Sequence, residues 1–168
     1  MNESIPNPDW REEVRKKVER AKSTAFSTEE VKKREEEQIL LQTQLHKGEI
    51  TSEEYKERKI VGDEGKAFFR TLPEFDEALK ILGLSEEYRK YVLSHENAHR
   101  MVAEQAGVDA YYMMILSKND SREDGRDWDV FIPAVYVNGL LDSPEIVKKI
   151  VEAPDDLSPN DKKIIGLD

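Results

Sequence analysis

Two strand-like runs in the C-terminal half of the chain place the strongest constraint on its fold. The runs are VDAYYMMILS at 108–117 and DWDVFIPAVYVN at 127–138, and the polar loop KNDSREDGR separates them. Aliphatic and aromatic runs on either side of a polar connection are typical of an antiparallel strand pair. Pro133 has no backbone N–H, so it predicts that the second run lies at a sheet edge or at a bulge. The sequence therefore predicts a small antiparallel sheet.

Helical segments are expected before and after this strand pair. Each has apolar residues at three- and four-residue spacing and begins or ends at a residue that favours that position. With the strand pair, these segments predict an α+β fold. The boundary residues are Pro73 and Gly83 for LPEFDEALKILG, Ser85 and Gly107 for EEYRKYVLSHENAHRMVAEQA, Ser143-Pro144 for EIVKKIVEA, and Ser158 for a last helical turn.

Residues 1–66 differ in composition from the rest and are interpreted as a charged helical extension. Glu, Lys and Arg dominate this part, and large apolar residues are few. Two capping boxes, Ser27 with Glu30 and Thr51 with Glu54, predict a helical hairpin. We expect the extension to pack lightly, so that residues 67–168 fold without it. It is interpreted as a solvated arm, a cover for a site elsewhere or an arm that binds a protein partner.

The composition excludes several classes of function. The net charge of −10 argues against nucleic acid as a partner, because phosphates would be repelled. The chain has no cysteine, which excludes disulfides and thiolate metal sites. No apolar run reaches the roughly 20 residues of a membrane span. The first residues also lack the layout of a signal peptide. The sequence predicts a soluble, cytoplasmic protein with no membrane or nucleic-acid partner.

One five-residue pattern, His95-Glu96-Asn97-Ala98-His99, lies midway along the expected helix at 86–106. Residues four apart on a helix lie one turn above each other, so both imidazoles can reach one zinc ion at about 2.0–2.1 Å. Glu96 then faces the same cleft without binding the metal. It can take a proton from a zinc-activated water and return it to a leaving amine.

The surroundings of the pattern favour a zinc site. Two of the three histidines of the chain occupy this spacing. They share a helix face with apolar residues, which predicts that both are buried or half-buried. The alternative is a pair of histidines satisfied by hydrogen bonds without a metal. The expected face consists of Tyr88, Val92, His95, His99, Val102 and Ala106.

Residues 95–161 resemble the peptidase domain of the membrane-anchored, ATP-dependent zinc proteases of the AAA class. That family has a His-Glu-x-x-His helix, a strand, a loop and a strand, a helix, and a closing segment whose Asp is the third zinc ligand. The matching segments here are HENAH, the strand pair, SPEIVKKIVEA and LSPNDKKII. The resemblance implies a zincin-like fold in which His95, His99 and Asp161 bind zinc and Glu96 is the catalytic base.

This chain departs from that family at several points. Ala98 stands where the family has Gly, and the helix between the strands and Asp161 is shorter. The chain has no Gly-rich phosphate loop and no ATPase module. The shared order of segments is also compatible with a general zincin plan.

Asp161 has a second interpretation, because it fits a capping box with Ser158. Other carboxylates therefore stay open as the third ligand. Glu104 is turned away from the zinc face, and the position of His46 at a helix C-terminus already accounts for it. The alternatives to Asp161 are Glu145, Asp155, Asp156 and Glu123.

These observations predict a small zinc-dependent metallopeptidase that acts on peptides or proteins. An exposed strand within 108–117 or 127–138 is expected to bind the substrate by strand addition. The alternative is a non-catalytic protein, either stabilised by zinc or acting as an adaptor through its charged arm. The two differ in the metal site, because a catalytic zinc keeps an open position and a structural zinc does not.

Overall fold

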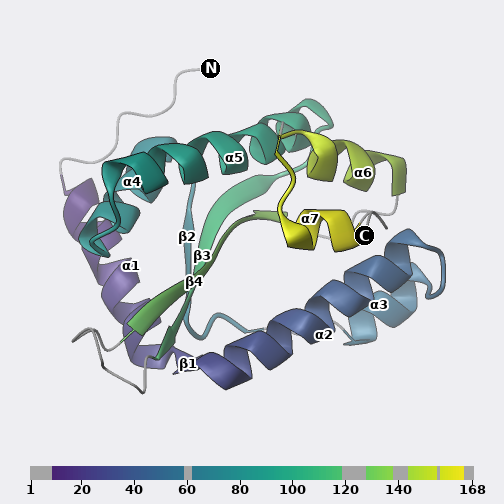
Figure 1. The fold of residues 1–168 in the computed structure, drawn as a ribbon, viewed down its shortest axis with the longest axis horizontal. Coiled ribbons are helices and arrows are strands. Elements are labelled where there is room, and N and C mark those ends of the chain that lie inside the picture. Colours follow the sequence, from purple (N-terminus) through teal and green to yellow (C-terminus); the bar gives the residue numbers. More distant parts are fainter. Residues whose placement is uncertain (1–8, 59–61, 119–127, 138–143, 155, 165–168) are drawn as a thin grey trace.

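The computed structural model has a mixed fold in which helices surround a small sheet (Figure 1). It describes residues 9–58, 62–118, 128–137, 144–154 and 156–164. The expected combination of helices and strands is confirmed. The elements in chain order are α1 (Trp10–Thr24), β1 (Phe26–Ser27), α2 (Thr28–His46), α3 (Ser52–Arg58), β2 (Lys66–Phe69), α4 (Leu72–Ile81), α5 (Glu86–Gln105), β3 (Ala110–Lys118), β4 (Trp128–Val137), α6 (Pro144–Glu152) and α7 (Pro159–Ile164).

β3 is the central strand of the sheet. It pairs with β4 along its whole length in antiparallel orientation. β2 pairs antiparallel with residues 112–115 of β3, and β1 pairs parallel with residues 117–118. Because a strand has two edges, β1 and β2 share the edge opposite β4. The expected antiparallel pair is therefore β3 and β4, and the expectation of a purely antiparallel sheet is wrong for β1.

β4 lies at an edge of the sheet and contains Pro133, as the sequence predicts. Among the described residues, β4 pairs with β3 alone. Its pairing shifts by one residue between Ile115 and Leu116 of β3, close to the proline. A proline at a sheet edge removes no hydrogen bond from an inner ladder, which explains its place.

Side-chain caps begin the helices that the sequence predicts. Ser27 accepts a hydrogen bond from the backbone N–H of Glu30 at the start of α2, and Ser85 accepts one from Tyr88 at the start of α5. Each cap satisfies a backbone donor that the first turn leaves without a partner. After α5, Gly107 has a φ of 78°, where a side chain would be strained, so it ends the helix.

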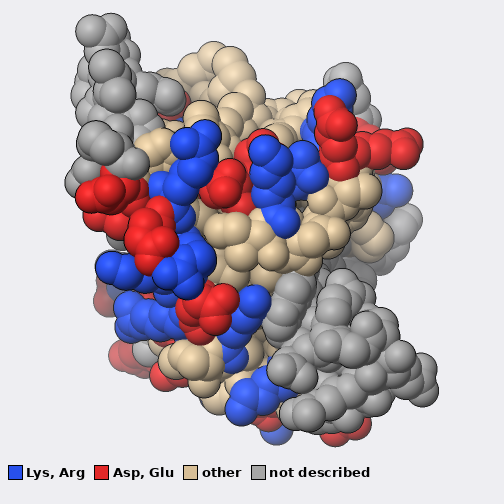
Figure 2. Space-filling view, turned by 90° about the vertical axis from the view of Figure 1, so that its left-hand side faces the viewer, with Lys and Arg blue, Asp and Glu red and all other residues tan. Residues whose placement is uncertain are grey.

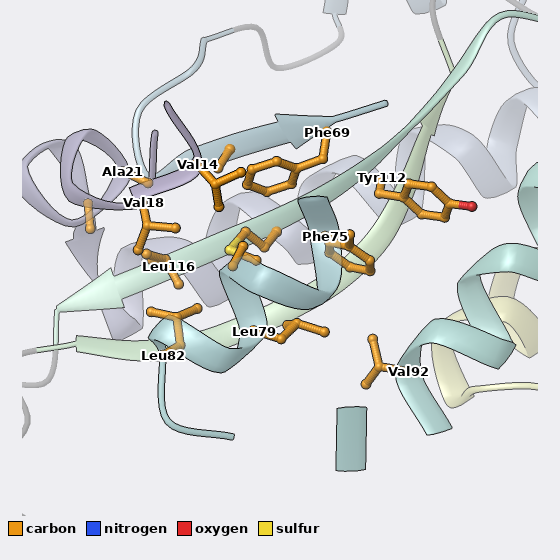
Figure 3. Close-up of a cluster of buried hydrophobic side chains, with 14 residues drawn as sticks. Val14, Val18, Ala21, Phe69, Phe75, Leu79, Leu82, Val92, Tyr112 and Leu116 are labelled. Carbon is orange, nitrogen blue, oxygen red and sulfur yellow. The ribbon is translucent and has the colours of Figure 1, made fainter. Parts of the chain in front are cut away.

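The main hydrophobic core lies between one face of β3 and the helices α1, α4 and α5. Side chains alternate along a strand, so Tyr112, Met114 and Leu116 point to the same face, and all three are fully buried. Figure 3 shows side chains of α1, α4 and β2 around them. The Phe75 ring of α4 stacks on the Tyr112 ring with 5.2 Å between centroids. Val92 of α5 lies in the same cluster, so this core also holds α5 against the sheet.

The expected light packing of residues 1–66 is wrong for α1. Val14, Val18 and Ala21 lie in the same buried cluster as Phe69, which comes after the expected boundary. Their spacing of four and three residues places them on one face of the helix, while the charged residues of α1 cover the other faces. The boundary at residue 66 therefore does not separate two cores.

α2 continues the N-terminal half on the other side of the sheet. The hydroxyl groups of Thr28 and Ser117 lie 3.1 Å apart, which joins the start of α2 to the end of β3. Further along, α2 packs against α6 and α7 (Figure 1). The N-terminal half thus packs against the sheet and contacts the C-terminal helices α6 and α7.

Charged side chains of both signs are interspersed on the face at the left of Figure 1, which Figure 2 shows directly. An ion pair at 3.9 Å joins Arg11 of α1 to Glu77 of α4. A second pair at 2.9 Å joins Asp76 of α4 to Arg89 of α5. Neighbouring opposite charges compensate one another here, so the negative net charge is not concentrated on this face.

The described helices are too short or too polar for any of them to span a membrane.

The place of α1 in the core predicts a stability effect. Val18 is fully buried, so Val18→Ala should lower the free energy of unfolding by about 1.5–2.5 kcal/mol, from lost burial and the cavity left behind. Urea denaturation followed by circular dichroism measures this change. Leu40→Ala is the control, because Leu40 is exposed on α2 and its loss should cost less than about 0.5 kcal/mol. Equal, small effects of both changes would contradict a core position for α1.

Candidate metal centre

Polar and cation–π contacts anchor the middle of α5 to β3. The Tyr112 hydroxyl donates a hydrogen bond to Asn97 Oδ1 at 3.0 Å. The Arg100 guanidinium lies 4.8 Å from the centre of the Tyr112 ring, and its Nε donates to the carbonyl of Ala110 at 3.4 Å. Asn97 and Arg100 flank the histidine positions, so these contacts fix how α5 presents the face with His95 and His99.

That face buries the three residues of the expected motif. His95, Glu96 and His99 are 9%, 6% and 6% exposed, so the expectation that both histidines are buried or half-buried is confirmed. The apolar face differs from the expected one at its ends, because Tyr88 and Ala106 are exposed. Glu96 was not part of the expected apolar face, but the structure buries it as well. This matters more, since a carboxylate away from water needs a partner.

Asp161 of α7 meets the two histidines across 62 or more residues of sequence. Its Oδ2 lies 3.2 Å from His95 Nε2 and 3.4 Å from His99 Nε2. The two Nε2 atoms lie 3.3 Å apart. The three atoms therefore form a nearly equilateral triangle.

The size of this triangle fits a tetrahedral metal ion. Ligand atoms about 2.0–2.1 Å from a zinc ion at tetrahedral angles lie about 3.3–3.4 Å from one another. All three separations lie within about 0.2 Å of that value. His95, His99 and Asp161 thus have the donor types and the spacing that zinc requires, with one further position available to a fourth ligand.

The hydrogen bond of His99 explains why a cation suits this cluster. His99 Nδ1 lies 2.7 Å from the carbonyl oxygen of Ile150 in α6. A carbonyl oxygen only accepts, so Nδ1 carries the proton and a neutral His99 has its lone pair on Nε2. That lone pair then faces the Asp161 carboxylate, and two acceptors repel each other unless a cation or a second proton lies between them. A metal-binding histidine usually makes such a bond with its other nitrogen.

Asp161 also caps α7, so its two interpretations are compatible. Its Oδ2 accepts a hydrogen bond from the Ser158 backbone N–H at 3.0 Å, and the Asp161 N–H donates to Ser158 Oγ at 3.1 Å. Burial acts to raise the pKa of Asp161, but the hydrogen bond from His95 and, once a second proton is on its Nε2, the bond and charge of His99 outweigh it and hold the pKa well below its usual range. The capping box orients the carboxylate that approaches the histidines.

Glu96 lies beside the triangle. Its Oε1 is 3.9 Å from His95 Nε2, and His95, Glu96 and His99 each offer a ligand atom within 4.8 Å of the others. Of the two carboxylates, Asp161 lies closer to the histidines, at 3.2 and 3.4 Å from their Nε2 atoms, than Glu96, at 3.9 Å from His95 Nε2. Burial raises the pKa of Glu96 to about 8, against the opposing effect of His95. A buried carboxyl with such a pKa can exchange protons near neutral pH.

In the described part of the chain, none of the other carboxylates considered as a third ligand lies in the triangle. Asp156 is exposed and accepts a hydrogen bond from Tyr91 at 3.4 Å. Glu104 pairs with Arg100 at 2.9 Å, away from the triangle. Glu145 belongs to α6, but its side chain, like Asp155 and Glu123, lies outside the described residues.

His46, at the end of α2, does not join the cluster. Among the described residues, the group that could hold a metal consists of His95, Glu96 and His99, extended by the Asp161 contacts. The buried Nδ1 of His46 has no hydrogen-bond partner in the described part of the chain.

Tyr91 is a residue of this site that the sequence interpretation missed. Its ring lies against the His95 ring, with 5.9 Å between centroids and 29° between the planes. The signal was present in the sequence, because Tyr91 precedes His95 by four residues and so lies one helical turn away.

No family model, curated protein or solved structure matches this chain.

The contacts of Asp161 predict how zinc binding depends on it. Asp161→Asn keeps the shape of the cap but removes the charge, so zinc affinity should fall by more than about 100-fold. Competition with a chelating dye measures the affinity. Ser158→Ala is the control, because it removes the bond that the Asp161 N–H donates and keeps the carboxylate; it should cost about 0.5–2 kcal/mol of stability and retain zinc. If Asp161→Asn binds zinc as well as the unaltered protein, Asp161 is a cap only.

The buried Glu96 predicts a pH-dependent stability of the metal-free protein. Its pKa rises from 4.5 to about 8 on folding, so the folded state binds more protons than the unfolded state between these values. The contribution of Glu96 to the free energy of unfolding should be largest below pH 4.5. It should be lost as pH rises from 4.5 through 8, by about 3–5 kcal/mol in total. Urea denaturation at several pH values in the presence of a chelator measures the slope. Glu96→Gln should flatten the curve in this window, and an unchanged slope would contradict the burial of an ionisable Glu96.

Proposed function

We propose that the chain is a zinc-dependent metallopeptidase, with zinc bound by His95, His99 and Asp161. The observation that carries the proposal is the triangle of His95 Nε2, His99 Nε2 and Asp161 Oδ2, with sides of 3.2, 3.3 and 3.4 Å. Two imidazoles and a carboxylate are the ligand types of many catalytic zinc sites. When bound, zinc would supply a Lewis acid that polarises a carbonyl and makes water more acidic.

The residues around the triangle have distinct roles in the proposed reaction. Glu96 takes a proton from the attacking water and transfers it to the leaving amine, because its carboxylate lies beside the triangle. Ile150 fixes the ring of His99 through its carbonyl oxygen. Ser158 holds the Asp161 carboxylate in place. The contacts of Asn97 and Arg100 with the sheet keep α5 in register.

A peptide substrate is expected to add as a strand at β4. Strand addition was expected within 108–117 or 127–138. β3 pairs along both edges, so it cannot accept another strand, and β4 at 128–137 is the one that can. In the described part of the chain, β4 pairs on one side only, and it packs beside α5, which carries the motif. Backbone hydrogen bonds of an edge strand bind an extended peptide without requiring a particular sequence.

A second candidate is a non-catalytic protein with a closed zinc site. The Glu96 carboxylate lies close enough to the histidines to serve as a fourth ligand, with a ligand atom within 4.8 Å of theirs. Four protein ligands leave no position for substrate, which is typical of structural zinc. An adaptor role for the charged arm stays a further alternative, with α2 and α3 as its surface because α1 is part of the core.

Glu96→Gln separates the two candidates. For a peptidase, this change should retain about one zinc per chain and lower the cleavage of labelled casein by at least about 100-fold, the size of a lost general base. Zinc is measured by elemental analysis of the purified protein. For a closed site, Glu96→Gln should weaken zinc binding instead, because an amide is a poorer ligand than a carboxylate.

His95→Ala and His99→Ala are the companion variants, and both should lose zinc and activity together. Glu104→Gln is the matched control, because Glu104 lies on the same helix and faces away from the site. Zinc content that is unchanged in both histidine variants would reject the metal site. Activity that is unchanged in Glu96→Gln would reject Glu96 as the base.

A further inference from the structure

Tyr91 places a hydroxyl group at the rim of the candidate metal centre. Its ring packs on the ring of His95, 5.9 Å between centroids, while 51% of the residue is exposed. The hydroxyl donates to Asp156 Oδ2, which lies two residues before Ser158 and five before Asp161. Tyr91 therefore extends from α5, the helix of His95, toward the segment that leads into α7 and Asp161.

The hydroxyl is available to another acceptor. Its bond to Asp156 is 3.4 Å long, longer than is usual for a hydrogen bond between oxygens, and Asp156 is exposed to water. Long bonds between exposed groups contribute little to stability, so exchanging this acceptor costs little. The ring, by contrast, packs on His95 and holds Tyr91 against the candidate metal centre.

We propose that Tyr91 is a second catalytic residue, which donates a hydrogen bond to the carbonyl oxygen of the scissile peptide bond. This inference rests on the proposed peptidase function. Tyr91 belongs to α5, the same rigid helix as His95 and Glu96, so its place relative to both is fixed by helix geometry. A donor on a packed element is oriented before the substrate arrives, which is what makes such groups effective.

The bonding changes of the reaction assign Tyr91 a role that Glu96 cannot fill. The oxygen of water forms a bond to the carbonyl carbon, and its proton moves to Glu96. The electron pair of the carbonyl double bond moves to the carbonyl oxygen, which then accepts the Tyr91 hydrogen bond more strongly. When the carbon–nitrogen bond breaks, the pair returns and Glu96 gives its proton to the amine. Tyr91 keeps its own proton throughout.

The competing role for Tyr91 is to hold the segment before α7 through Asp156. The two roles differ in their dependence on Asp156 and on zinc. A segment anchor acts on Asp161, so losing either partner should weaken zinc binding equally. A donor to the substrate lowers the barrier of the reaction instead. It requires Asp156 neither for zinc binding nor for cleavage.

Tyr91→Phe tests the inference, because it removes the hydroxyl and keeps the ring on His95. We measure zinc affinity, kcat and KM on a fluorogenic peptide from the main casein cleavage site, and calorimetric binding of a phosphinic analogue of that peptide. The expected result is unchanged zinc affinity, kcat lowered by about 100-fold with KM nearly unchanged, and clearly weaker binding of the tetrahedral phosphinate. Tyr88→Phe, one turn earlier and exposed, should change none of these values.

Asp156→Ala should leave zinc affinity and kcat at the level of the unaltered protein. Equal losses of zinc affinity in Tyr91→Phe and Asp156→Ala would overturn the inference in favour of the anchor role. An active Tyr91→Phe variant with unchanged phosphinate binding would overturn it and leave the peptidase function standing. If the unaltered protein binds zinc but neither cleaves casein nor binds the phosphinate, the proposed function fails, and the role of Tyr91 fails with it.

Discussion

The central position of β3 determines where every other part of the molecule lies. Its backbone is paired along both edges, and all its side chains except Lys118 are buried or half-buried, so a shift in register would expose core residues. Tyr112 shows how this constraint reaches the site, because one side chain stacks on α4, hydrogen-bonds α5 and receives the Arg100 guanidinium. The orientation of α5, and with it the direction of both histidine rings, follows from a strand that contributes no residue to the candidate metal centre.

Electrostatics within the site point the same way as its geometry. A carboxylate that is buried against two imidazoles in a protein usually shares a proton or a metal ion with them, because desolvation of the unshared charge would raise the free energy of the folded state. Here a backbone carbonyl of α6 accepts a hydrogen bond from His99 Nδ1, and a backbone N–H just before α7 donates one to the Asp161 carboxylate. Both supporting groups are main-chain atoms, so the site depends on helix placement more than on further side chains.

Local features could be predicted from the sequence, and non-local ones could not. The caps at Ser27 and Ser85 and the burial of His95 and His99 follow from spacing within one helix, and the structure confirms them. β1 and β2 have two and four residues, too short for a periodic signal. The core face of α1 was present at four- and three-residue spacing, but abundant charge on the other faces concealed it. Placing Asp161 beside His95 requires the fold itself.

The double role of Asp161 couples the order of the C-terminal helix to the occupancy of the site. A helix of six residues does not persist alone in water, so α7 depends on its cap and on its packing against α2. The atom that completes the cap is also the atom that faces the histidines. Were a cation to bind Asp161 and thereby stabilise the contact between α2 and α7, the coupling would be reciprocal, and anything that stabilises this contact would raise the affinity for the cation by the same factor. An effector that touches only the N-terminal half of the molecule would thereby control the metal at a distance.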